Sequence, residues 1–347
     1  MIQVIAGTRP EVLKLAPVVF ALRGRGAEVE LVGVEQQPGL VRATLAEVGL
    51  EVDRWLPMVS GALERRLGRL VEAVGEGLRA DPPRVLVVHG DTTTALAGAL
   101  AGFYAGVPVA HVEAGLRSGN RDSPFPEEAH RQLIDRLSRW WFAPTVEAGA
   151  TLLAEGCDAE RVHVVGNTVV DALLAAKARG GVLPAEVEVA LAGEARTVLV
   201  TCHRRENHGE AMVRVAQAVG RLREAGCVVM AIEHPHPATA GVAEAATVAV
   251  GPLGHGAFVR LLEAVDVVLT DSGGVQEECV ALGRRAWVLR EETERPEGVR
   301  SGHLVVVGTG VEAVVAAVGV GKVDGFVDAA PYGDGRAGEG IAAVLLG

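Results

Sequence analysis

The sequence predicts two doubly wound α/β domains, each built on a parallel sheet with helices on both faces. The first observation is length, because 347 residues suit two domains, with one large α/β domain as the alternative. The second is rhythm: short apolar runs alternate with helical segments, and the pattern starts afresh in the second half of the chain. The third is that the predicted strands are short and mainly apolar, which suits a parallel sheet covered on both faces.

In the first half, apolar runs predict strands at Ile2–Ala6, Val29–Val34, Arg84–His89, Val107–Glu113 and Phe142–Pro144. Helices are expected at Glu11–Arg23, Gly39–Val48, Leu63–Leu78, Thr92–Tyr104 and Glu127–Trp141. Most of these helices follow a strand at short distance, which is the repeating unit of a parallel sheet.

The second half repeats this order. Strands are expected at Thr197–Thr201, Cys227–Ile232, Val267–Thr270, Ala286–Leu289 and Leu304–Val307, and helices at Gly209–Glu224, Phe258–Ala264 and Gln276–Leu282. Gly180, Gly181 and Pro184 loosen the chain between the halves, so a linker is expected near Gly166–Gly181. The expected domains are therefore residues 1–167 and 168–332.

Composition excludes several classes of protein. Hydrophobic residues make up 49% and charged residues 22%, which suits a chain with a sizeable core and not a disordered one. No apolar run approaches the ~20 residues of a membrane-spanning helix, and the N-terminus lacks the pattern of a signal peptide. A net charge of −11 argues against nucleic acid as a partner. The four cysteines form no CxxC pair, so we expect neither a zinc ribbon nor disulfides, and a cytoplasmic protein.

The first predicted strand ends in a turn that is suited to an anion. Thr8 and Glu11 have the spacing of a capping box, and Pro10 fits the first helical turn. The amides of such a helix start favour an anion, and Arg9 and Lys14 add positive charge. The alternative is an ordinary helix cap with surface charges. The segment is neither GxGxxG nor a P-loop, so it indicates neither a nicotinamide nor a Walker nucleotide site.

Carboxylates follow the next strands. Asp91 and Glu113 come at the ends of two strands that are expected to be neighbours, and Glu127 begins a helix. Asp91 has an alternative role as a helix N-cap, and Glu127 has one in the helix dipole. Glu113 follows an apolar strand, where a carboxylate costs several kcal/mol unless it is paired. Three carboxylates brought together can perform acid–base chemistry near neutral pH.

The second half offers a matching set of residues. His203 follows a strand and titrates in the right range for a general acid or base. Ser272, Gly273 and Gly274 precede a helix and resemble a phosphate cradle, and Glu278 lies about one turn further, within reach of a ribose. Cys202 has no thiol-enzyme signature around it, and the histidines near His234 favour a turn over a metal site.

The motifs together resemble the UDP-N-acetylglucosamine 2-epimerase family, in particular its bacterial, non-hydrolysing members. In order they are GTRPE, HGDTTT, HVEAGLRSG, PFPEE, GNTVVD, HRREN, DSGGVQEE, TERPE and PYGDG, beginning at Gly7, His89, His111, Pro124, Gly166, His203, Asp271, Thr293 and Pro331. The resemblance spans nearly the whole chain, and several long motifs in fixed order are more specific than any one glycine loop.

The resemblance implies two Rossmann-like domains that face each other across a cleft, as in B-type glycosyltransferases, with the C-terminal segment 333–347 packing back on the first. It also implies an enzyme that interconverts UDP-N-acetylglucosamine and UDP-N-acetylmannosamine without cofactor or metal. UDP is eliminated to give 2-acetamidoglucal and then adds back. A homodimer that serves polysaccharide biosynthesis is implied as well.

Residue roles are carried over from the family by position. Asp91, Glu113, Glu127 and His203 resemble its catalytic residues. The residues that resemble its substrate and UDP ligands are Arg9, Lys14, Ser272, Gly273, Gly274 and Glu278. Gln36, Arg204 and His234 resemble positions of a second, allosteric UDP-sugar site, although Pro38 and Gly39 replace polar residues expected beside Gln36.

Other functions stay open on the sequence. A hydrolysing 2-epimerase would release UDP and free N-acetylmannosamine. A relative could act on a modified UDP-sugar, such as a 2,3-diacetamido uronic acid. A B-type glycosyltransferase shares the fold but leaves the carboxylates without a role. A UDP-sugar-binding protein without turnover is disfavoured by the intact set of catalytic residues.

Overall fold

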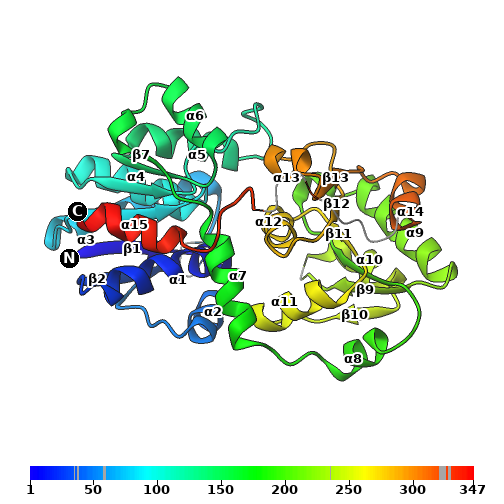
Figure 1. The fold of residues 1–347 in the computed structure, drawn as a ribbon. Coiled ribbons are helices and arrows are strands. Elements are labelled where there is room, and N and C mark those ends of the chain that lie inside the picture. Colours follow the sequence, from blue (N-terminus) through cyan, green and yellow to red (C-terminus); the bar gives the residue numbers. More distant parts are fainter. Residues whose placement is uncertain (35, 37–38, 58–59, 235, 320–325, 327–329) are drawn as a thin grey trace. The chain divides into compact units, whose positions relative to one another are not determined.

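The structure is a computed structural model that describes the chain except for residues 35, 37–38, 58–59, 235, 320–325 and 327–329. The chain divides into two compact units (Figure 1). Unit 1 comprises Met1–Ala172 and Tyr332–Gly347, and unit 2 comprises Leu173–Pro331. The boundaries expected from the sequence, after residues 167 and 332, lie within a few residues of these divisions.

Unit 1 contains a parallel sheet in the order β3-β2-β1-β4-β5-β6-β7. Its strands are β1 (Ile2–Ala6), β2 (Val29–Val34), β3 (Arg54–Leu56), β4 (Val85–His89), β5 (Val109–Val112), β6 (Trp140–Ala143) and β7 (Val162–Val164). Its helices are α1 (Arg9–Gly24), α2 (Leu40–Val48), α3 (Leu63–Ala80), α4 (Thr93–Ala105), α5 (Glu127–Leu137), α6 (Val146–Ala154) and α15 (Ala337–Leu346), and α7 (Thr168–Arg179) runs across the division into unit 2.

Successive residues of β1 serve two separate cores, which explains why four of its five residues are apolar; the exception, Gln3, is buried and donates to Glu30. Val4 packs into a core with α1, α2 and α15, whereas Ile5 packs into a core with α3 and α4. Side chains of a strand point alternately to its two faces, and both faces are covered here. Helices α1 and α4 therefore lie on opposite faces, and the chain changes direction between β1 and β4. In such sheets, ligands bind at this switch point, beyond the carboxyl ends of the strands.

Unit 2 repeats the arrangement with a parallel sheet in the order β10-β9-β8-β11-β12-β13. Its strands are β8 (Thr197–Thr201), β9 (Val228–Ile232), β10 (Val248–Val250), β11 (Val267–Thr270), β12 (Ala286–Val288) and β13 (Leu304–Val306). Its helices are α8 (Ala185–Leu191), α9 (Glu210–Glu224), α10 (Ala240–Ala245), α11 (His255–Ala264), α12 (Gly273–Ala281), α13 (Pro296–Arg300) and α14 (Val311–Gly319). The switch point of this sheet lies between β8 and β11.

The helix predicted at Glu127–Trp141 is too long, because the structure ends α5 at Leu137 and starts β6 at Trp140. Ser138 is extended and its hydroxyl bonds back to Ile134, which closes the helix. The apolar run after it then joins the sheet beside β5. Helical spacing continued through the break in the sequence, so periodicity alone did not reveal it.

The chain passes from unit 1 to unit 2 within the stretch Gly166–Gly181, where a linker was predicted, but α7 occupies most of it, so the loose linker expected there is wrong. Val169, Leu173 and Ala176 recur at helical spacing and are buried, whereas Leu174 is exposed. Gly166 and Gly180, both with positive φ, stand just outside the helix. The glycines therefore mark the ends of an ordered helix.

Helix α15 returns the end of the chain to unit 1, where it packs on α1 (Figure 1). Gly338 lies so close to Pro17 that a Cβ atom there would be 2.8 Å from the Pro17 carbonyl oxygen. The carboxylate of Asp171 accepts hydrogen bonds from the amides of Ala337 and Gly338, which fixes the start of the helix.

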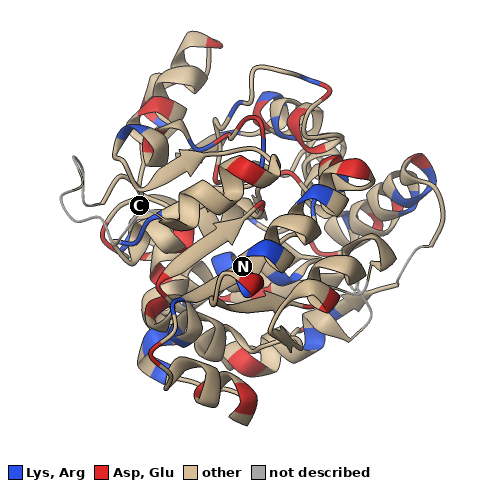
Figure 2. Cartoon of the chain, turned by 90° about the vertical axis from the view of Figure 1, so that its right-hand side faces the viewer, with Lys and Arg blue, Asp and Glu red and all other residues tan. Residues whose placement is uncertain are grey.

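The surface carries both signs of charge. Figure 2 shows positions of Lys and Arg interspersed with positions of Asp and Glu along the ribbon, as is usual for a solvated protein. Among the described residues, no helix combines the length and the apolar character that crossing a membrane requires.

Candidate active site

The turn between β1 and α1 holds a buried carboxyl group. The Thr8 hydroxyl caps α1 by accepting a hydrogen bond from the Glu11 amide, as the predicted capping box requires. Glu11 is 1% exposed, and its carboxylate accepts from the Gly7 amide and the Thr8 hydroxyl, both at 2.9 Å. Burial raises the pKa of Glu11 and outweighs the hydrogen bonds, which lower it. The start of α1 thus already carries an acidic group, and Arg9 stands half-buried beside it.

Glu11 also joins the two turns at the switch point of unit 1. The Thr92 hydroxyl, which caps α4 after β4, donates to Glu11 at 2.6 Å. The turns approach so closely that a Cβ atom on Gly7 would lie 2.1 Å from the Thr94 hydroxyl oxygen. The side chain of Gln36, which follows β2, donates to the same hydroxyl. The ends of β1, β2 and β4 are therefore tied into one edge.

Glu113 follows β5 directly and has an unusual backbone. Its φ is 66°, so its backbone is in the left-handed region. Among the described residues, every other residue with a positive φ is a glycine. Such strain costs about 1–3 kcal/mol and clusters at functional sites. The carboxylate forms a buried ion pair with Lys14 of α1, and Nε2 of His89 lies 3.5 Å from the same oxygen. Lys14 is thus the partner that the sequence required for Glu113.

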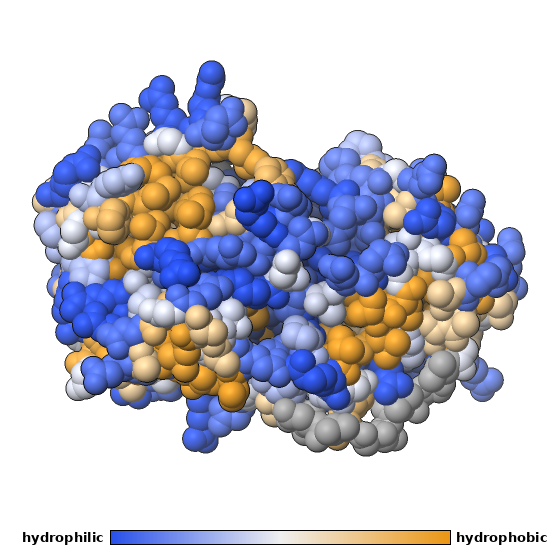
Figure 3. Space-filling model, turned by 90° about the horizontal axis from the view of Figure 1, so that it is seen from above, coloured by the Kyte–Doolittle hydropathy of each residue, from blue (hydrophilic) through white to orange (hydrophobic). Residues whose placement is uncertain are grey.

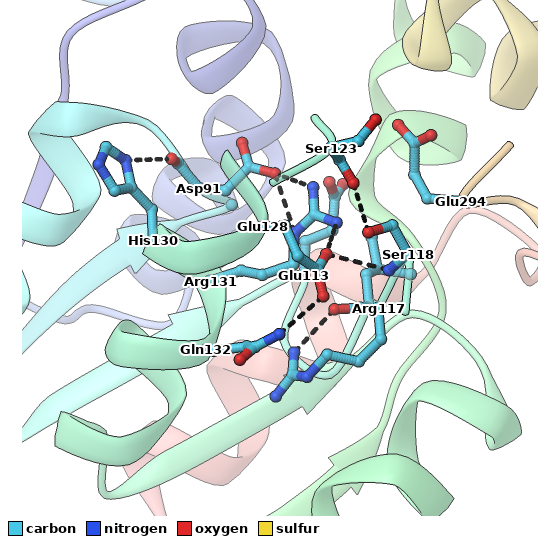
Figure 4. Close-up of polar contacts among 12 residues, drawn as sticks. Asp91, Glu113, Arg117, Ser118, Ser123, Glu128, His130, Arg131, Gln132 and Glu294 are labelled. Carbon is cyan, nitrogen blue, oxygen red and sulfur yellow. Dashed lines mark hydrogen bonds and ion pairs between the residues drawn. The ribbon is translucent and has the colours of Figure 1, made fainter. Parts of the chain in front are cut away.

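Asp91 follows β4 and pairs with a cation. Thr92, not Asp91, caps α4, so the alternative role of Asp91 as the N-cap is wrong. Its carboxylate instead accepts from the guanidinium of Arg131 on α5, with Nε at 3.2 Å. Figure 4 shows Arg131 reaching Asp91 with one edge and Glu128 with the other. Glu128 is fully buried and also accepts from the Ser118 amide. Arg131 and Glu128 were not predicted, although their spacing places them on one face of α5.

Glu127 stands apart from these pairs. It is the first residue of α5, follows Pro126 and is half-buried. In the part of the chain that the structure describes, its carboxylate has no hydrogen bond and no ion pair. Of the three carboxylates predicted from the sequence, Asp91 and Glu113 are thus bound to cations, whereas Glu127 has no such partner among the described residues.

A further buried carboxylate, Asp135 of α5, supports the end of β5. It accepts from the His111 ring at 2.6 Å, from the Gly115 amide at 3.3 Å and from the Arg117 guanidinium at 2.8 Å. Burial raises the pKa of Asp135, but His111 and Arg117 outweigh it and hold the pKa below its ordinary value. These contacts bracket Glu113 on both sides in sequence, so Asp135 fixes the backbone that displays it.

In unit 2, Asp271 organises the switch point between β8 and β11. It is fully buried after β11 and accepts from the amides of His203 and Arg204, at 3.0 and 2.9 Å, and from the Asn207 side chain at 2.9 Å. The Cys202 thiol donates to it as well. One aspartate thereby holds the loop that follows β8, a role that the sequence did not reveal.

His203 presents its ring from this loop. Burial lowers the pKa of His203, and the Asp271 carboxylate, 3.7 Å from Nδ1, raises it by less. The ring is therefore neutral near pH 7 and can accept a proton. The ring of His234 stacks on it, with centroids 5.3 Å apart. His203, Arg204 and His234 thus lie together, as their shared position after β8 and β9 suggests.

The segment after β11 has backbone amides that are available to donate hydrogen bonds to a ligand. Ser272 precedes α12, and Gly273 and Gly274 are its first residues. Within the described residues, the amides of Gly273, Gly274 and Val275 donate no hydrogen bond. A Cβ atom on Gly273 would lie 3.2 Å from the guanidinium of Arg295, whereas one on Gly274 would meet nothing within 4 Å. Only the second glycine faces open space.

Two features considered in the sequence have structural roles. Burial, with Asp271 beside it, raises the pKa of the Cys202 thiol far above its ordinary value, so the thiol is not a nucleophile. The ring nitrogens of His234 and His236 accept hydrogen bonds from the amides of His236 and Ala238, and the short 3-10 helix Pro237–Thr239 follows. No group of three or more potential metal-ligating side chains with suitable geometry occurs among the residues described.

The candidate residues therefore fall into two sets. Unit 1 holds Asp91, Glu113, Glu127, Arg9, Lys14 and Gln36, all at the carboxyl edge of its sheet or at the start of a helix there. Unit 2 holds His203, Arg204, His234, Ser272, Gly273, Gly274 and Glu278 in the corresponding places. Within each unit, the set lies where an open parallel sheet binds ligands.

Comparison with known proteins identifies the family. The family model described as UDP-N-acetylglucosamine 2-epimerase matches residues 21–346. The UDP-N-acetylglucosamine 2-epimerase of Bacillus subtilis is 37% identical over 99% of this chain and 94% of its own. The chain belongs to the UDP-N-acetylglucosamine 2-epimerase family. The enzyme of that name from Yersinia pestis is also 37% identical, over 90% of this chain and 88% of its own.

Solved structures of this family have the same fold. The Neisseria meningitidis UDP-GlcNAc 2-epimerase bound to UDP-GlcNAc matches with a TM-score of 0.89 at 30% identity over 99% of both chains. The Methanocaldococcus jannaschii enzyme in complex with UDP-GlcNAc and UDP matches with a TM-score of 0.87 at 32% identity, again over 99% of both chains. The family and the two parallel α/β domains expected from the sequence are confirmed.

Proposed function

We propose that this chain interconverts UDP-N-acetylglucosamine and UDP-N-acetylmannosamine by inverting carbon 2 of the amino sugar. Membership of an epimerase family supports the reaction class. The observation that carries the proposal is Glu113, a carboxylate held in a strained backbone conformation beside Lys14. It follows β5, which pairs with β4, the strand that precedes Asp91. Proton transfer at carbon requires acid–base groups fixed in this way.

The proposed reaction is an elimination followed by an addition. A base removes the proton at C2 while the C1–O bond to UDP breaks, which leaves UDP and 2-acetamidoglucal. An acid then returns a proton to the opposite face of C2, and UDP adds back at C1. No net oxidation occurs, so acid–base groups and the bound UDP account for every proton and electron pair.

The charged groups beside each carboxylate of unit 1 suggest which carboxylate acts as a base and which acts as an acid. Asp91 and Glu113 lie against Arg131 and Lys14, which stabilise negative charge on them. Glu127 has no cationic partner among the described residues. We assign acceptance of the single C2 proton to the pair of Asp91 and Glu113, which would hold it between them, and donation of a proton from the opposite side to Glu127, with these roles exchanged in the reverse direction. His203, neutral near pH 7, is the acid–base group that unit 2 contributes.

Unit 2 is suited to hold the leaving diphosphate. Breaking the C1–O bond builds negative charge on it, and the open amides at the start of α12 together with the helix dipole stabilise that charge. Gly274 leaves room for a phosphate to approach, and Ser272 offers a hydroxyl. Arg9 and Lys14 are the cations proposed to assist, and Glu278 is proposed to contact the ribose.

A regulatory contact is proposed for Gln36, Arg204 and His234. The stacking of His234 on His203 supports it, because a ligand on one ring would be felt by the other. Of the two residues that depart from the expected pattern, Pro38 lies outside the described residues, whereas Gly39 precedes α2 with a positive φ. Initial rates that rise more steeply than hyperbolically with UDP-N-acetylglucosamine would support such a contact, and hyperbolic kinetics would count against it.

We also propose that the enzyme works as a homodimer in the cytoplasm. Apolar side chains lie among hydrophilic ones on the face in Figure 3, and the neighbouring Phe103 and Tyr104 of unit 1 are 60% and 73% exposed. All four cysteines are free thiols, which suits a reducing compartment. Light scattering would test the dimer, and a monomer at micromolar concentration would contradict it.

Product analysis tests the proposed reaction. The purified chain is incubated with UDP-N-acetylglucosamine, and nucleotide sugars and free sugars are separated by chromatography. We expect UDP-N-acetylmannosamine to form until a constant ratio of the two UDP-sugars is reached, with no free sugar accumulating. Release of UDP with free N-acetylmannosamine would instead show hydrolysis, and an unchanged substrate would refute the assignment of this substrate.

A further inference from the structure

A buried hydrogen bond joins Glu278 to a histidine in unit 2. Glu278 lies in the second turn of α12, and His255 is the first residue of α11. Nε2 of His255 lies 2.7 Å from Oε1 of Glu278, and the two side chains are 2% and 9% exposed. His255 belongs to none of the motifs that carry the family resemblance.

This bond settles how the Glu278 carboxylate points before any ligand arrives. A glutamate side chain loses much rotamer entropy when it must hold one orientation, and here that loss occurs on folding instead of on binding. An ionised carboxylate has about four lone-pair positions at which it can accept a hydrogen bond. The His255 ring occupies one of them, on Oε1. The others, including both on Oε2, stay available to neighbouring hydroxyl groups.

The backbone under His255 is itself held firmly. A Cβ atom on Gly256 would lie 1.9 Å from the carbonyl oxygen of Gly180, and one on Gly181 would lie 2.1 Å from the amide nitrogen of Ala257. The first turn of α11 thus makes backbone-to-backbone contact with the segment after α7, which only glycine permits. A residue on so rigid a support can orient another side chain within the tolerance that recognition requires.

We propose that His255 is a positioning residue that sets Glu278 to accept hydrogen bonds from the 2′- and 3′-hydroxyls of the nucleotide ribose. This inference rests on the proposed function, in which Glu278 contacts the ribose. A cis-diol presents two donors on adjacent carbons, and an oriented carboxylate accepts both. The pair therefore makes the enzyme selective for ribonucleotides, because a 2′-deoxyribonucleotide leaves one buried acceptor unpaired.

The alternative is that His255 only ties α11 to α12. In that case its loss would lower stability and weaken all nucleotides equally. The selectivity between UDP and 2′-deoxy-UDP separates the two roles, because a merely structural tie does not move the ratio of their dissociation constants.

The experiment measures both dissociation constants by calorimetry on the full-length chain. Wild type is expected to bind UDP about tenfold more tightly than 2′-deoxy-UDP. Glu278→Ala should bring the two constants close together, and His255→Phe should reduce the ratio by about threefold or more in the same direction. His255→Gln, which keeps an N–H donor, should retain most of the ratio. With UDP-N-acetylglucosamine as substrate, His255→Phe should raise KM and leave kcat nearly unchanged.

Two further variants serve as an alternative and as a control. His255→Asn is polar but too short to reach Glu278, so it carries the same prediction as the phenylalanine variant if that one does not fold. His303→Phe removes another fully buried histidine of unit 2, which bonds to Ser301, and should leave the ratio unchanged. A wild-type ratio in both His255→Phe and His255→Asn would overturn the proposal, as would a wild type without ribose preference. Failure of wild type to bind UDP at all would overturn the proposed function first.

Discussion

At the scale of single residues, Glu113 combines two unfavourable features. A left-handed backbone costs about 1–3 kcal/mol in a residue other than glycine, and a buried carboxylate costs several more without a partner. Lys14 offsets the second, and the contacts of Asp135 with the residues on either side hold the first in place. A protein retains such a residue when its exact placement matters more than stability.

The first prediction concerns the charge of this residue. Glu113→Gln keeps the shape of the side chain but removes the base, so kcat should fall by about 100-fold or more. UDP binding should stay within about threefold of wild type, because the substitution leaves the open amides of unit 2 and the proposed cations Arg9 and Lys14 in place. Calorimetry with UDP and a turnover assay measure the two effects. Full activity in this variant would remove Glu113 from the mechanism.

The second prediction tests the ion pair with Lys14 through a double-mutant cycle. Lys14→Met leaves the Glu113 carboxylate buried without this cation, so the free energy of unfolding should fall by about 3 kcal/mol. Adding Glu113→Gln removes the stranded charge and should restore part of that loss. Urea unfolding of the two single variants and the double variant measures the coupling. Additive losses would show that the two groups do not stabilise each other.

At the scale of elements, hydrogen bonds from a buried aspartate hold a loop or strand end at the carboxyl edge of each sheet. Asp135 of α5 holds the end of β5, and Asp271 after β11 holds the loop after β8. Both aspartates are buried among several donors, so removing one leaves several groups unsatisfied at once. The loops that carry candidate catalytic groups are thus anchored more strongly than ordinary surface loops.

The pH dependence of stability follows from the shifted pKa of Asp135, which lies below its ordinary value of 3.8. A carboxylate with a depressed pKa stabilises the fold above its ordinary pKa and loses this contribution as pH falls below it. Asp135→Asn should therefore lower the free energy of unfolding by about 3 kcal/mol at pH 7. The difference from wild type should shrink as pH falls below about 3.8. Urea midpoints at several pH values measure it, and a difference that does not change with pH would contradict the ionised state of Asp135.

The sequence predicted elements best where a strand is apolar and a helix long. The strands at Ile2–Ala6, Val29–Val34, Thr197–Thr201 and Val267–Thr270 begin and end as expected. The strands β3, β7 and β10, of three residues each, were missed, whereas the equally short β12 and β13 were found because each belongs to an apolar run of four residues. The helices α6, α8, α10 and α13 to α15 were not predicted either, and α7 was taken for a linker.

The candidate residues were found by their place after strands, but their partners were not. Arg131 and Asp135 lie on α5, far in sequence from Asp91 and His111, which they contact. Single-sequence patterns report neighbours within an element and carry little information on such distant pairs. The requirement that Glu113 be paired was foreseeable, whereas the choice of Lys14 as its partner needed the fold.

At the scale of the whole molecule, unit 1 depends on the last residues of the chain. Ile341 and Ala342 of α15 are fully buried in the core that also contains β1 and α1. The final helix is therefore part of the first domain, and a chain that ends before it leaves the apolar face of α1 exposed to water.

This dependence predicts a local loss of stability. Ile341→Ala should destabilise unit 1 by about 2–4 kcal/mol, because it opens a cavity in the core. Hydrogen exchange followed by mass spectrometry should show faster exchange in β1, with β8 of unit 2 unchanged. Val189→Ala, at a position on α8 that is 75% exposed, is the control and should alter neither. Equal acceleration in β1 and β8 of the Ile341 variant would mean that the units do not unfold independently.

The central claim is that this chain moves a proton on and off carbon 2 of a UDP-sugar. A proton NMR time course with UDP-N-acetylglucosamine in D2O, with EDTA present, tests it most directly. We expect UDP-N-acetylmannosamine to appear with deuterium at C2, because the proton that returns comes from groups in exchange with solvent. Product that keeps the original hydrogen at C2 would contradict removal of the proton to exchangeable acid–base groups, and with it the roles assigned to Asp91, Glu113 and Glu127.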